Sequence, residues 1–167
     1  MGANIGNHAI YYEKFMEPSK IILIEPNPRA IHLLKKNLGI NNCTKMDTSF
    51  LGIGAGKKRE RFSLRDDQLN NLGAAQLEPA ADGDIEVASL DEIIKEEISF
   101  IKIDVENMEM DVLEGAKRII EDHQPDVFIE VMNKNIPEFL NFLGMISYKV
   151  RKEFKYMNAV NFYVVPD

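Results

Sequence analysis

Polar residues at four places in this sequence have the types and the spacing to bind a ligand or to move a proton. The first place is the segment Gly2-Ala-Asn-Ile-Gly6-Asn-His8, in which two glycines lie four residues apart ahead of a helical pattern. Glycine lets the backbone pass close to a ligand, and the free N–H groups of a helix start bind carboxylates and phosphates. Small residues at a tight turn also serve packing, so this segment alone leaves both roles open.

Glu25 is the second place, at the end of a short apolar run 23 residues after Gly2. In nucleoside-binding α/β folds, an acid at this position accepts hydrogen bonds from the two ribose hydroxyls. The alternative is an acid favoured by the dipole of the next helix. The glycine pattern G-x-x-x-G lacks the middle glycine that lets a pyrophosphate approach, so a nucleoside without phosphates fits better than NAD.

The third and fourth places are carboxylates near the ends of two later apolar runs. Asp104 and Glu106 could hold an ammonium group, orient a hydroxyl or act as a base. Glu109 is explained more simply by the favourable dipole of a helix start. Glu130 lies within a buried strand pattern, where a charge needs a partner or a cleft. Lys102 could supply that partner, so a structural and a catalytic role both stay open for Glu130.

The elements that must position these residues are visible in the pattern of the chain. Apolar runs typical of buried strands alternate with amphipathic helical patterns, which predicts an α/β fold with a mainly parallel sheet and helices on both faces. The carboxyl ends of such strands form the usual ligand site. The last two strands lack an intervening helix and should pair as an antiparallel hairpin. The expected strands span residues 21–25, 44–53, 61–64, 99–105, 126–132, 147–153 and 161–165.

The helical patterns carry boundary signals of their own. Asn27 has the residue type of an N-cap, Pro28 suits the first helical position, and Gly39 predicts the end of that helix. Ser89 and Glu92 predict a capping box for a short helix. Residues 65–84 are polar and without periodicity, which is typical of a functional or disordered loop. The expected longer helices span residues 4–16, 28–38, 108–122 and 135–143.

Composition limits the class of protein. A chain of 167 residues has the size of one domain, so we expect a single domain over residues 1–167. Asp and Glu outnumber Lys and Arg by 27 to 20, and a net charge of −7 argues against a partner that is nucleic acid or an anionic membrane. One cysteine, Cys43, excludes an intrachain disulfide, and no apolar run reaches the roughly 18 residues of a membrane span. We therefore expect a cytoplasmic protein.

Three motifs, taken together, resemble the FkbM family of S-adenosylmethionine-dependent methyltransferases. They are GANIGNH, then IEPNP, then FIKIDVENMEMDVLEGA with Glu130 later. The resemblance extends over almost the whole chain, including the final hairpin. It implies the Rossmann-like class I methyltransferase fold, with an antiparallel final strand. It also implies, in most members, methyl transfer to a hydroxyl of a sugar, a glycan or a natural product.

The resemblance further implies which residues bind S-adenosylmethionine. The glycine segment would line its methionine part, Glu25 would hold the ribose, and the two residues after Glu25 would lie beside the adenine. Asp47 would close the other side of the adenine, and Asp104 would face the amino group or the sulfonium methyl. The implied cofactor-binding residues are Gly2, Asn4, Gly6, Glu25, Pro26, Asn27, Asp47 and Asp104.

Glu106 is then the first choice for the base or for substrate binding, with Asp104 beside it. His8 is a second candidate base, and its alternative role is packing within a helix. The polar loop around Asn70, Asn71 and Gly73 would cover the acceptor. Magnesium is a weaker expectation, since carboxylate oxygens suit this ion, whereas no His or Cys pattern indicates zinc.

Two positions depart from the family pattern. The family has a strand and an acid before the first glycine, whereas Met1 alone precedes Gly2 here. The chain could be cut short, begin at an internal methionine, borrow the strand from a partner as in a homodimer, or be a decayed enzyme. Asn107 stands where the family usually has glycine, which predicts a positive φ that asparagine tolerates well.

Three other classes of function compete with a methyltransferase. The first is a non-catalytic nucleoside-binding domain, and the second is one half of an obligate assembly completed by another chain. The third is a nicotinamide-dependent oxidoreductase, which the glycine spacing and the antiparallel end of the sheet disfavour.

Overall fold

The computed structural model describes residues 1–65 and 75–167, which form two compact units. Unit 1 comprises Met1–Gly54 and Glu60–Val87, and unit 2 comprises Ala55–Arg59 and Ala88–Asp167. The predicted loop residues Asn70, Asn71 and Gly73 lie outside the described residues. Within the described residues, no helix combines the length and the apolarity needed to cross a membrane.

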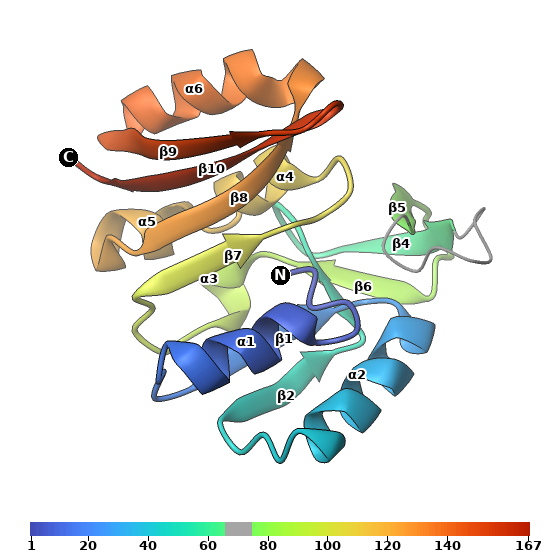
Figure 1. Ribbon diagram of the computed structural model, residues 1–167. Helices are drawn as coiled ribbons and strands as arrows, with labels where there is room; N and C mark the ends of the chain where they lie inside the picture. Colours follow the sequence, from blue (N-terminus) through green and yellow to red (C-terminus); the bar gives the residue numbers. More distant parts are fainter. Residues whose placement is uncertain (66–74) are drawn as a thin grey trace. The chain divides into compact units, whose positions relative to one another are not determined.

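A parallel strand pair forms the centre of unit 1 (Figure 1). β1 (Ile21–Glu25) pairs with β2 (Met46–Leu51), and the last three residues of β1 are buried. The apolar run over residues 21–25 therefore forms the strand that was predicted. α1 (Asn7–Phe15) precedes β1, and α2 (Pro28–Ile40) connects β1 to β2.

The start of α1 lies three residues later than predicted. Asn4 and Gly6 both have positive φ, 47° and 85°, so the chain cannot be helical before Asn7. A Cβ on Gly6 would lie 3.3 Å from Cγ of Leu34, which is tighter than an ordinary contact. Glycine at this position therefore serves both the turn and the close packing of α1 on α2.

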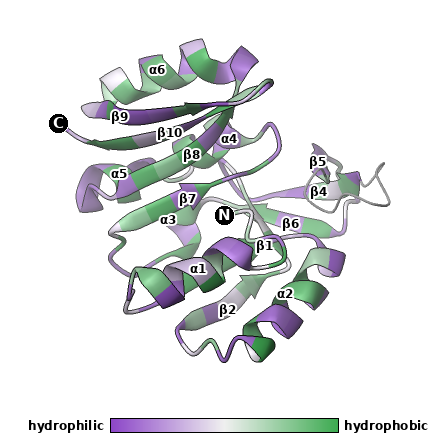
Figure 2. Cartoon of the chain, viewed as in Figure 1, coloured by the Kyte–Doolittle hydropathy of each residue, from purple (hydrophilic) through white to green (hydrophobic). Residues whose placement is uncertain are grey.

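α2 confirms its predicted start and corrects its predicted end. Asn27 is the N-cap, and its Oδ1 accepts a hydrogen bond from the backbone N–H of Arg29 at 2.9 Å. The helix continues through Gly39, because the left-handed residue that turns the chain is Asn42, with φ of 54°. Hydrophobic and hydrophilic residues alternate along α2 (Figure 2), and its buried residues are Ala30, Leu34 and Leu38.

Short strands form a second, four-stranded sheet in the order β3-β6-β4-β5. Its strands are β3 (Ile53–Ala55), β4 (Glu60–Arg65), β5 (Gln76–Pro79) and β6 (Ile85–Ala88). β4 pairs antiparallel with both β5 and β6. The presence of β5 corrects the prediction of an irregular segment over residues 65–84. Four residues with two polar positions carry too little periodicity to reveal a strand, which forms by pairing Leu77 with Leu64.

Unit 2 contains a four-stranded sheet in the order β7-β8-β10-β9. Its strands are β7 (Phe100–Ile103), β8 (Asp126–Met132), β9 (Tyr148–Lys155) and β10 (Ala159–Pro166). β7 and β8 are parallel, whereas β10 runs antiparallel to both β8 and β9, so the predicted C-terminal hairpin is confirmed (Figure 1). The sheets of this chain are thus mixed, and a mainly parallel sheet is not confirmed.

The helices of unit 2 depart from the prediction between residues 108 and 122, where two helices replace one. α4 (Glu109–Glu114) and α5 (Lys117–His123) are separated at Gly115. A Cβ at Gly115 would collide with the carbonyl oxygen of Gly56, so the chain bends where a distant segment approaches it. The remaining helical elements are α3 (Leu90–Ile93), η2 (Asn133–Asn135) and α6 (Ile136–Met145).

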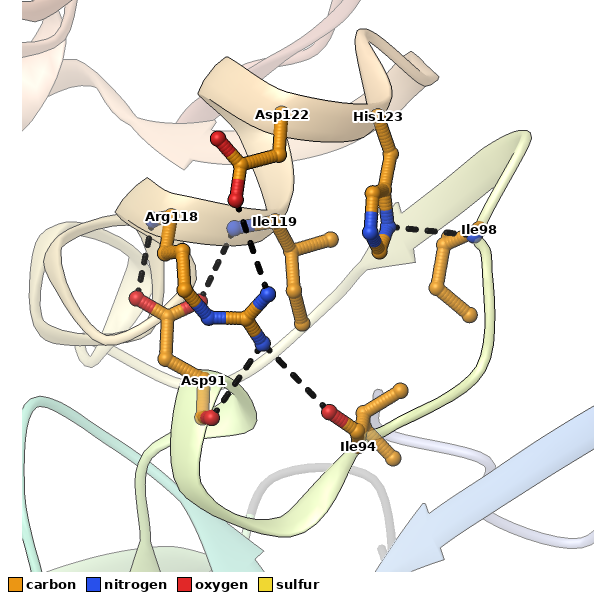
Figure 3. A network of polar contacts seen from close by, with 7 residues as sticks. All are labelled: Asp91, Ile94, Ile98, Arg118, Ile119, Asp122 and His123. Carbon is orange, nitrogen blue, oxygen red and sulfur yellow. Dashed lines mark hydrogen bonds and ion pairs between the residues drawn. The ribbon is translucent and has the colours of Figure 1, made fainter.

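The side chain of Asp91, a residue of α3, caps the N-terminus of α5 (Figure 3). Its carboxylate accepts hydrogen bonds from the backbone N–H groups of Arg118 at 2.8 Å and Ile119 at 3.0 Å. The predicted capping box of Ser89 and Glu92 is wrong: within the described residues Ser89 makes no side-chain capping bond, and Glu92 pairs with an arginine instead. A side chain from α3 thus caps α5, which the sequence had predicted to be one continuous helix with α4.

Candidate functional site

The carboxylate of Glu25 is the centre of the polar cluster in unit 1. Glu25 ends β1 and is 7% exposed. Its Oε2 accepts the backbone N–H of Asn4 at 2.7 Å, and its Oε1 accepts the backbone N–H of Asn27 at 3.0 Å. One buried carboxylate therefore holds both the glycine segment and the start of α2. Each carboxylate oxygen has two lone pairs and can accept more than one hydrogen bond.

The glycine segment forms a tight turn against the end of β1. Gly2 has φ of 66°, and the backbone N–H of Ala3 donates to the carbonyl oxygen of Ile24 at 3.2 Å. Asn37 of α2 donates its Nδ2 to the carbonyl oxygen of Ile5 at 2.8 Å. These bonds from two elements fix the segment, and the structure thereby places Asn4 of the glycine segment and Asn27 on the two oxygens of Glu25.

Two buried side-chain atoms of this cluster lack a hydrogen-bond partner within the described part of the chain. They are Oδ1 of Asn4, an acceptor, and Nδ2 of Asn27, a donor. Asn27 is 1% exposed, so its amide is shielded from bulk solvent. Buried polar groups are almost always hydrogen-bonded in folded proteins. An unpaired acceptor and an unpaired donor beside a carboxylate fit a ligand rich in hydroxyl groups, as a nucleoside is.

The structure does not bring Asp47 to this cluster. The register pairs Asp47 with Ile22, whereas Glu25 pairs with Leu51, four residues further along β2. Four residues of strand span about 13 Å. Asp47 instead contacts Lys20 at 2.7 Å, and hydrogen bonds from Lys20 and Ser49 lower its pKa to about 2. The residue that sequence reading missed at the ligand end of β2 is Gly52, whose N–H donates to the carbonyl oxygen of Glu25 at 2.8 Å.

His8 lies on the first turn of α1 and is exposed. Its ring stacks on that of Tyr12, with 6.3 Å between the ring centroids and 22° between the planes. Tyr12 lies one helical turn further along α1, so this contact is within the helix. This contact with Tyr12 supports a packing role for His8, the alternative that the sequence left open.

Unit 2 contains four carboxylates near the ends of β7 and β8: three follow β7, and the fourth, Glu130, lies within β8. Asp104 follows β7, and one of its oxygens lies 2.6 Å from Nζ of Lys102. The Lys102 side chain is 10% exposed and the Asp104 side chain is 37% exposed, so the lysine end of this ion pair is buried and the carboxylate end is accessible to solvent. The sequence left open that Lys102 partners Glu130, and the structure shows an ion pair of Lys102 with Asp104.

Glu130 lies in β8 opposite Asn161 of β10, and Nδ2 of Asn161 lies 3.4 Å from its Oε1. Burial raises the pKa of Glu130, and the negative charge of Asp104 and a hydrogen bond with it raise the pKa further. Asn161 could not have been connected to Glu130 from sequence, because the strand register that pairs them is a tertiary property.

Glu106 lies on the turn between β7 and α4, and Glu109 is the first residue of α4. Burial raises the pKa of Glu106, and the charges of Asp104 and Glu109 add to the effect. Glu109 is 2% exposed, and burial raises its pKa although Asn107 N–H at 3.1 Å and Asn135 Nδ2 at 2.8 Å both donate to it. Asn107 has φ of 64°, which confirms the predicted left-handed residue. A buried carboxylate thus ties this turn to the segment before α6, a role that the helix-dipole interpretation missed.

The chemistry available to this arrangement is acid–base chemistry. Carboxyls with raised pKa values accept a proton more readily than ordinary ones, and they lie beside an ionised partner held by a lysine. Among the described residues, no three His, Cys, Asp or Glu side chains are placed to hold one metal ion. The expectation of magnesium is therefore not supported.

The comparisons with known proteins agree with the predicted resemblance. Residues 1–156 match the family model described as Methyltransferase FkbM domain. A search of curated proteins found no match.

Solved structures of methyltransferases share the fold of this chain. The methyltransferase FkbM of Methylobacillus flagellatus KT is 21% identical, with a TM-score of 0.72 over 97% of this chain and 41% of that chain. The ribosomal protein L11 methylase of Lactobacillus delbrueckii subsp. bulgaricus is 9% identical, with a TM-score of 0.62 over 99% and 67%. Precorrin-6y C5,15-methyltransferase of Geobacter metallireducens GS-15 is 14% identical, with a TM-score of 0.59 over 99% and 76%. These likenesses show a Rossmann-like class I methyltransferase fold, and this chain spans 41% of the first structure.

Proposed function

This chain belongs to the FkbM methyltransferase family, and from that premise we propose that it binds S-adenosylmethionine and methylates a hydroxyl oxygen of a sugar, a glycan or a natural product. The observation that carries the proposal is the buried carboxylate of Glu25, which holds the glycine segment and the start of α2 at once. It supports a nucleoside site at the end of β1, where open α/β sheets bind their ligands.

The residues of unit 1 fit the nucleoside part of this cofactor. Glu25 would accept hydrogen bonds from ribose hydroxyls, and the glycine segment offers backbone that a ligand can approach closely. Pro26 and Asn27 would lie beside the adenine. Asp47, tied to Lys20 at the other end of β2, is left out of this set. When bound, S-adenosylmethionine supplies a methyl group that is already electrophilic.

In unit 2 we propose that Glu106 takes the proton of the acceptor hydroxyl. A hydroxyl acceptor must lose its proton when it is methylated, and a carboxylate held against that hydroxyl can take it. The raised pKa of Glu106 makes this carboxylate a stronger base than an exposed glutamate. Asp104, ionised beside Lys102, would orient the acceptor rather than take its proton. Positioning of this kind supplies about 7–11 kcal/mol of a barrier in favourable cases.

The proposal also includes the setting of the reaction. We propose a cytoplasmic enzyme of one domain with a small-molecule or glycan acceptor, and without nucleic acid or membrane partners. We propose further that the enzyme forms a homodimer. The acidic balance of the chain supports the absence of polyanionic partners.

Calorimetric titration of the chain with S-adenosylhomocysteine tests the proposal, with NAD as the control ligand. We expect micromolar affinity for the first ligand and no binding of the second. A methyl-transfer assay with hydroxyl acceptors then tests catalysis. Binding without turnover on any acceptor would favour the non-catalytic nucleoside-binding class, and a folded chain that binds neither ligand would contradict the proposal.

A further inference from the structure

Asn27 uses one half of its side-chain amide and leaves the other half unpaired. Its Oδ1 caps α2 through the backbone N–H of Arg29 at 2.9 Å. Its Nδ2 is buried and has no partner among the described residues, and the residue as a whole is 1% exposed. A buried donor without a partner destabilises the folded protein. The cap alone does not require this donor, since serine caps a helix as well as asparagine does.

Asn4 has an unpaired acceptor, the counterpart of the unpaired donor of Asn27. Its Oδ1 is a buried acceptor without a partner within the described part of the chain. The backbone N–H groups of Asn4 and Asn27 both donate to the Glu25 carboxylate, at 2.7 Å and 3.0 Å. The unpaired acceptor and the unpaired donor therefore belong to the two residues that flank one carboxylate.

The chemistry of these three groups selects the kind of ligand atom that satisfies them. An ionised carboxylate and an amide oxygen only accept hydrogen bonds, so a ligand group that bonds to Glu25 or to Asn4 must be a donor. An amide nitrogen only donates, so the ligand must also accept from Asn27. An ammonium group donates but cannot accept, and it would leave Nδ2 unpaired. A hydroxyl does both, and a pair of hydroxyls satisfies all three groups.

We propose that Asn27 is a specificity-determining residue that recognises the hydroxyls of the cofactor's ribose. Its Oδ1 keeps the cap of α2, and its Nδ2 donates to the oxygen of a ribose hydroxyl whose proton is donated to Glu25. Oδ1 of Asn4 accepts from the ribose hydroxyls as well. This inference rests on the proposed function, because it takes the nucleoside of S-adenosylmethionine as the ligand.

The variant Asn27→Ser separates the two halves of the amide. Serine keeps an oxygen that caps α2 and removes Nδ2, so we expect a melting temperature close to that of wild type. We expect the affinity for S-adenosylhomocysteine to fall about tenfold, the loss of one hydrogen bond to a buried partner. Asn158→Ser, an exposed asparagine of unit 2, is the matched control and should change neither value.

A ligand without the hydroxyl completes the test. The 2′-deoxy and 3′-deoxy analogues of S-adenosylhomocysteine should bind wild type more weakly, and for one of them Asn27→Ser should cause little further loss. Equal affinity of wild type and Asn27→Ser for S-adenosylhomocysteine would overturn the inference. The inference would also be overturned if Asn27→Ser lowered the affinity for all three ligands by the same factor.

The inference stays testable if Asn27→Ser does not fold, since wild type alone must then discriminate against a deoxy analogue by about tenfold. Equal binding of all three ligands by wild type would overturn it. Its failure is distinct from failure of the proposed function: wild type that does not bind S-adenosylhomocysteine at all overturns both, whereas binding without discrimination overturns the role of Asn27 alone.

Discussion

The backbone N–H of Asn4 donates to Oε2 of Glu25 at 2.7 Å, so the end of β1 holds the glycine segment that precedes α1. The second carboxylate oxygen holds Asn27 at 3.0 Å. The glycine segment and the acid are 21 residues apart in sequence, and this bond makes them one structural feature. A ligand at Glu25 therefore meets a turn that is already formed.

Replacing Glu25 tests that relationship. We expect Glu25→Ala to weaken binding of S-adenosylhomocysteine by about ten- to a hundredfold, because hydrogen bonds to a charged group are lost. The variant also leaves two buried backbone N–H groups unpaired, so the free energy of unfolding should fall by about 1–3 kcal/mol. Calorimetric titration and urea unfolding measure the two effects. Glu97→Ala, at an exposed position, is the control, and an affinity equal to wild type would remove Glu25 from the ligand site.

Glu106 is expected to affect turnover and not cofactor binding. Glu106→Gln keeps the shape of the side chain and cannot take a proton, so turnover should fall by about a hundredfold or more. Affinity for S-adenosylhomocysteine should stay within about twofold of wild type, since Glu106 is assigned to the acceptor. Steady-state assays and titrations of Glu106→Gln and Glu97→Gln measure both quantities.

The pH dependence of turnover provides a separate test of Glu106. A base is active when it is ionised, and burial raises the pKa of Glu106 above its ordinary value of 4.5. Turnover of wild type should therefore rise with pH through an apparent pKa above 4.5. A profile that is the same for wild type and Glu106→Gln would assign the proton to another group.

How far the sequence predicts this fold depends on whether a signal is local. The Asn27-Pro28 pair specifies the start of α2, because a cap and a fixed φ act on the residues beside them. Asn107 likewise predicts its own positive φ. The end of α2 was misplaced because either Gly39 or Asn42 can supply a turning residue, and the sequence does not rank them.

Features that depend on distant partners could not be predicted. The break at Gly115 comes from the approach of Gly56, and the exclusion of Asp47 comes from the register of β1 and β2. Glu109 resembles any acid at a helix start until its burial and its bond to Asn135 are known. Site residues next to a strand end or a glycine turn could therefore be predicted from the sequence. The residues that hydrogen-bond to them could be identified only from the structure.

The raised pKa of Glu130 has a consequence for stability. Between the ordinary pKa of 4.5 and the raised pKa, the folded state binds more protons than the unfolded state, so the free energy of unfolding falls as pH rises through this range. Glu130→Gln does not titrate, and we expect its stability relative to wild type to increase from pH 4 to pH 7. Urea unfolding of both proteins at several pH values measures the difference. A difference that does not change with pH, as expected for Glu97→Gln, would contradict the raised pKa.

Asp91 should control the start of α5. Its carboxylate accepts the second and third N–H groups of that helix, from Arg118 and Ile119. The guanidinium of Arg118 contacts the carbonyl oxygens of Asp91 and Ile94 at 3.3 Å and 3.5 Å (Figure 3). Asp91→Ala removes both side-chain bonds and should lower the free energy of unfolding by about 1–2 kcal/mol.

Asp122 is the matched control for Asp91, because it contacts the same arginine at 3.7 Å from the exposed face of α5 (Figure 3). An exposed ion pair one helical turn apart contributes about 0.3–0.5 kcal/mol, so Asp122→Ala should change stability much less than Asp91→Ala. Urea unfolding of the two variants beside wild type measures the difference. Equal effects would show that α5 does not depend on its cap from α3, and that packing of Ile119 and Ile120, both nearly inaccessible to solvent, holds the helix instead.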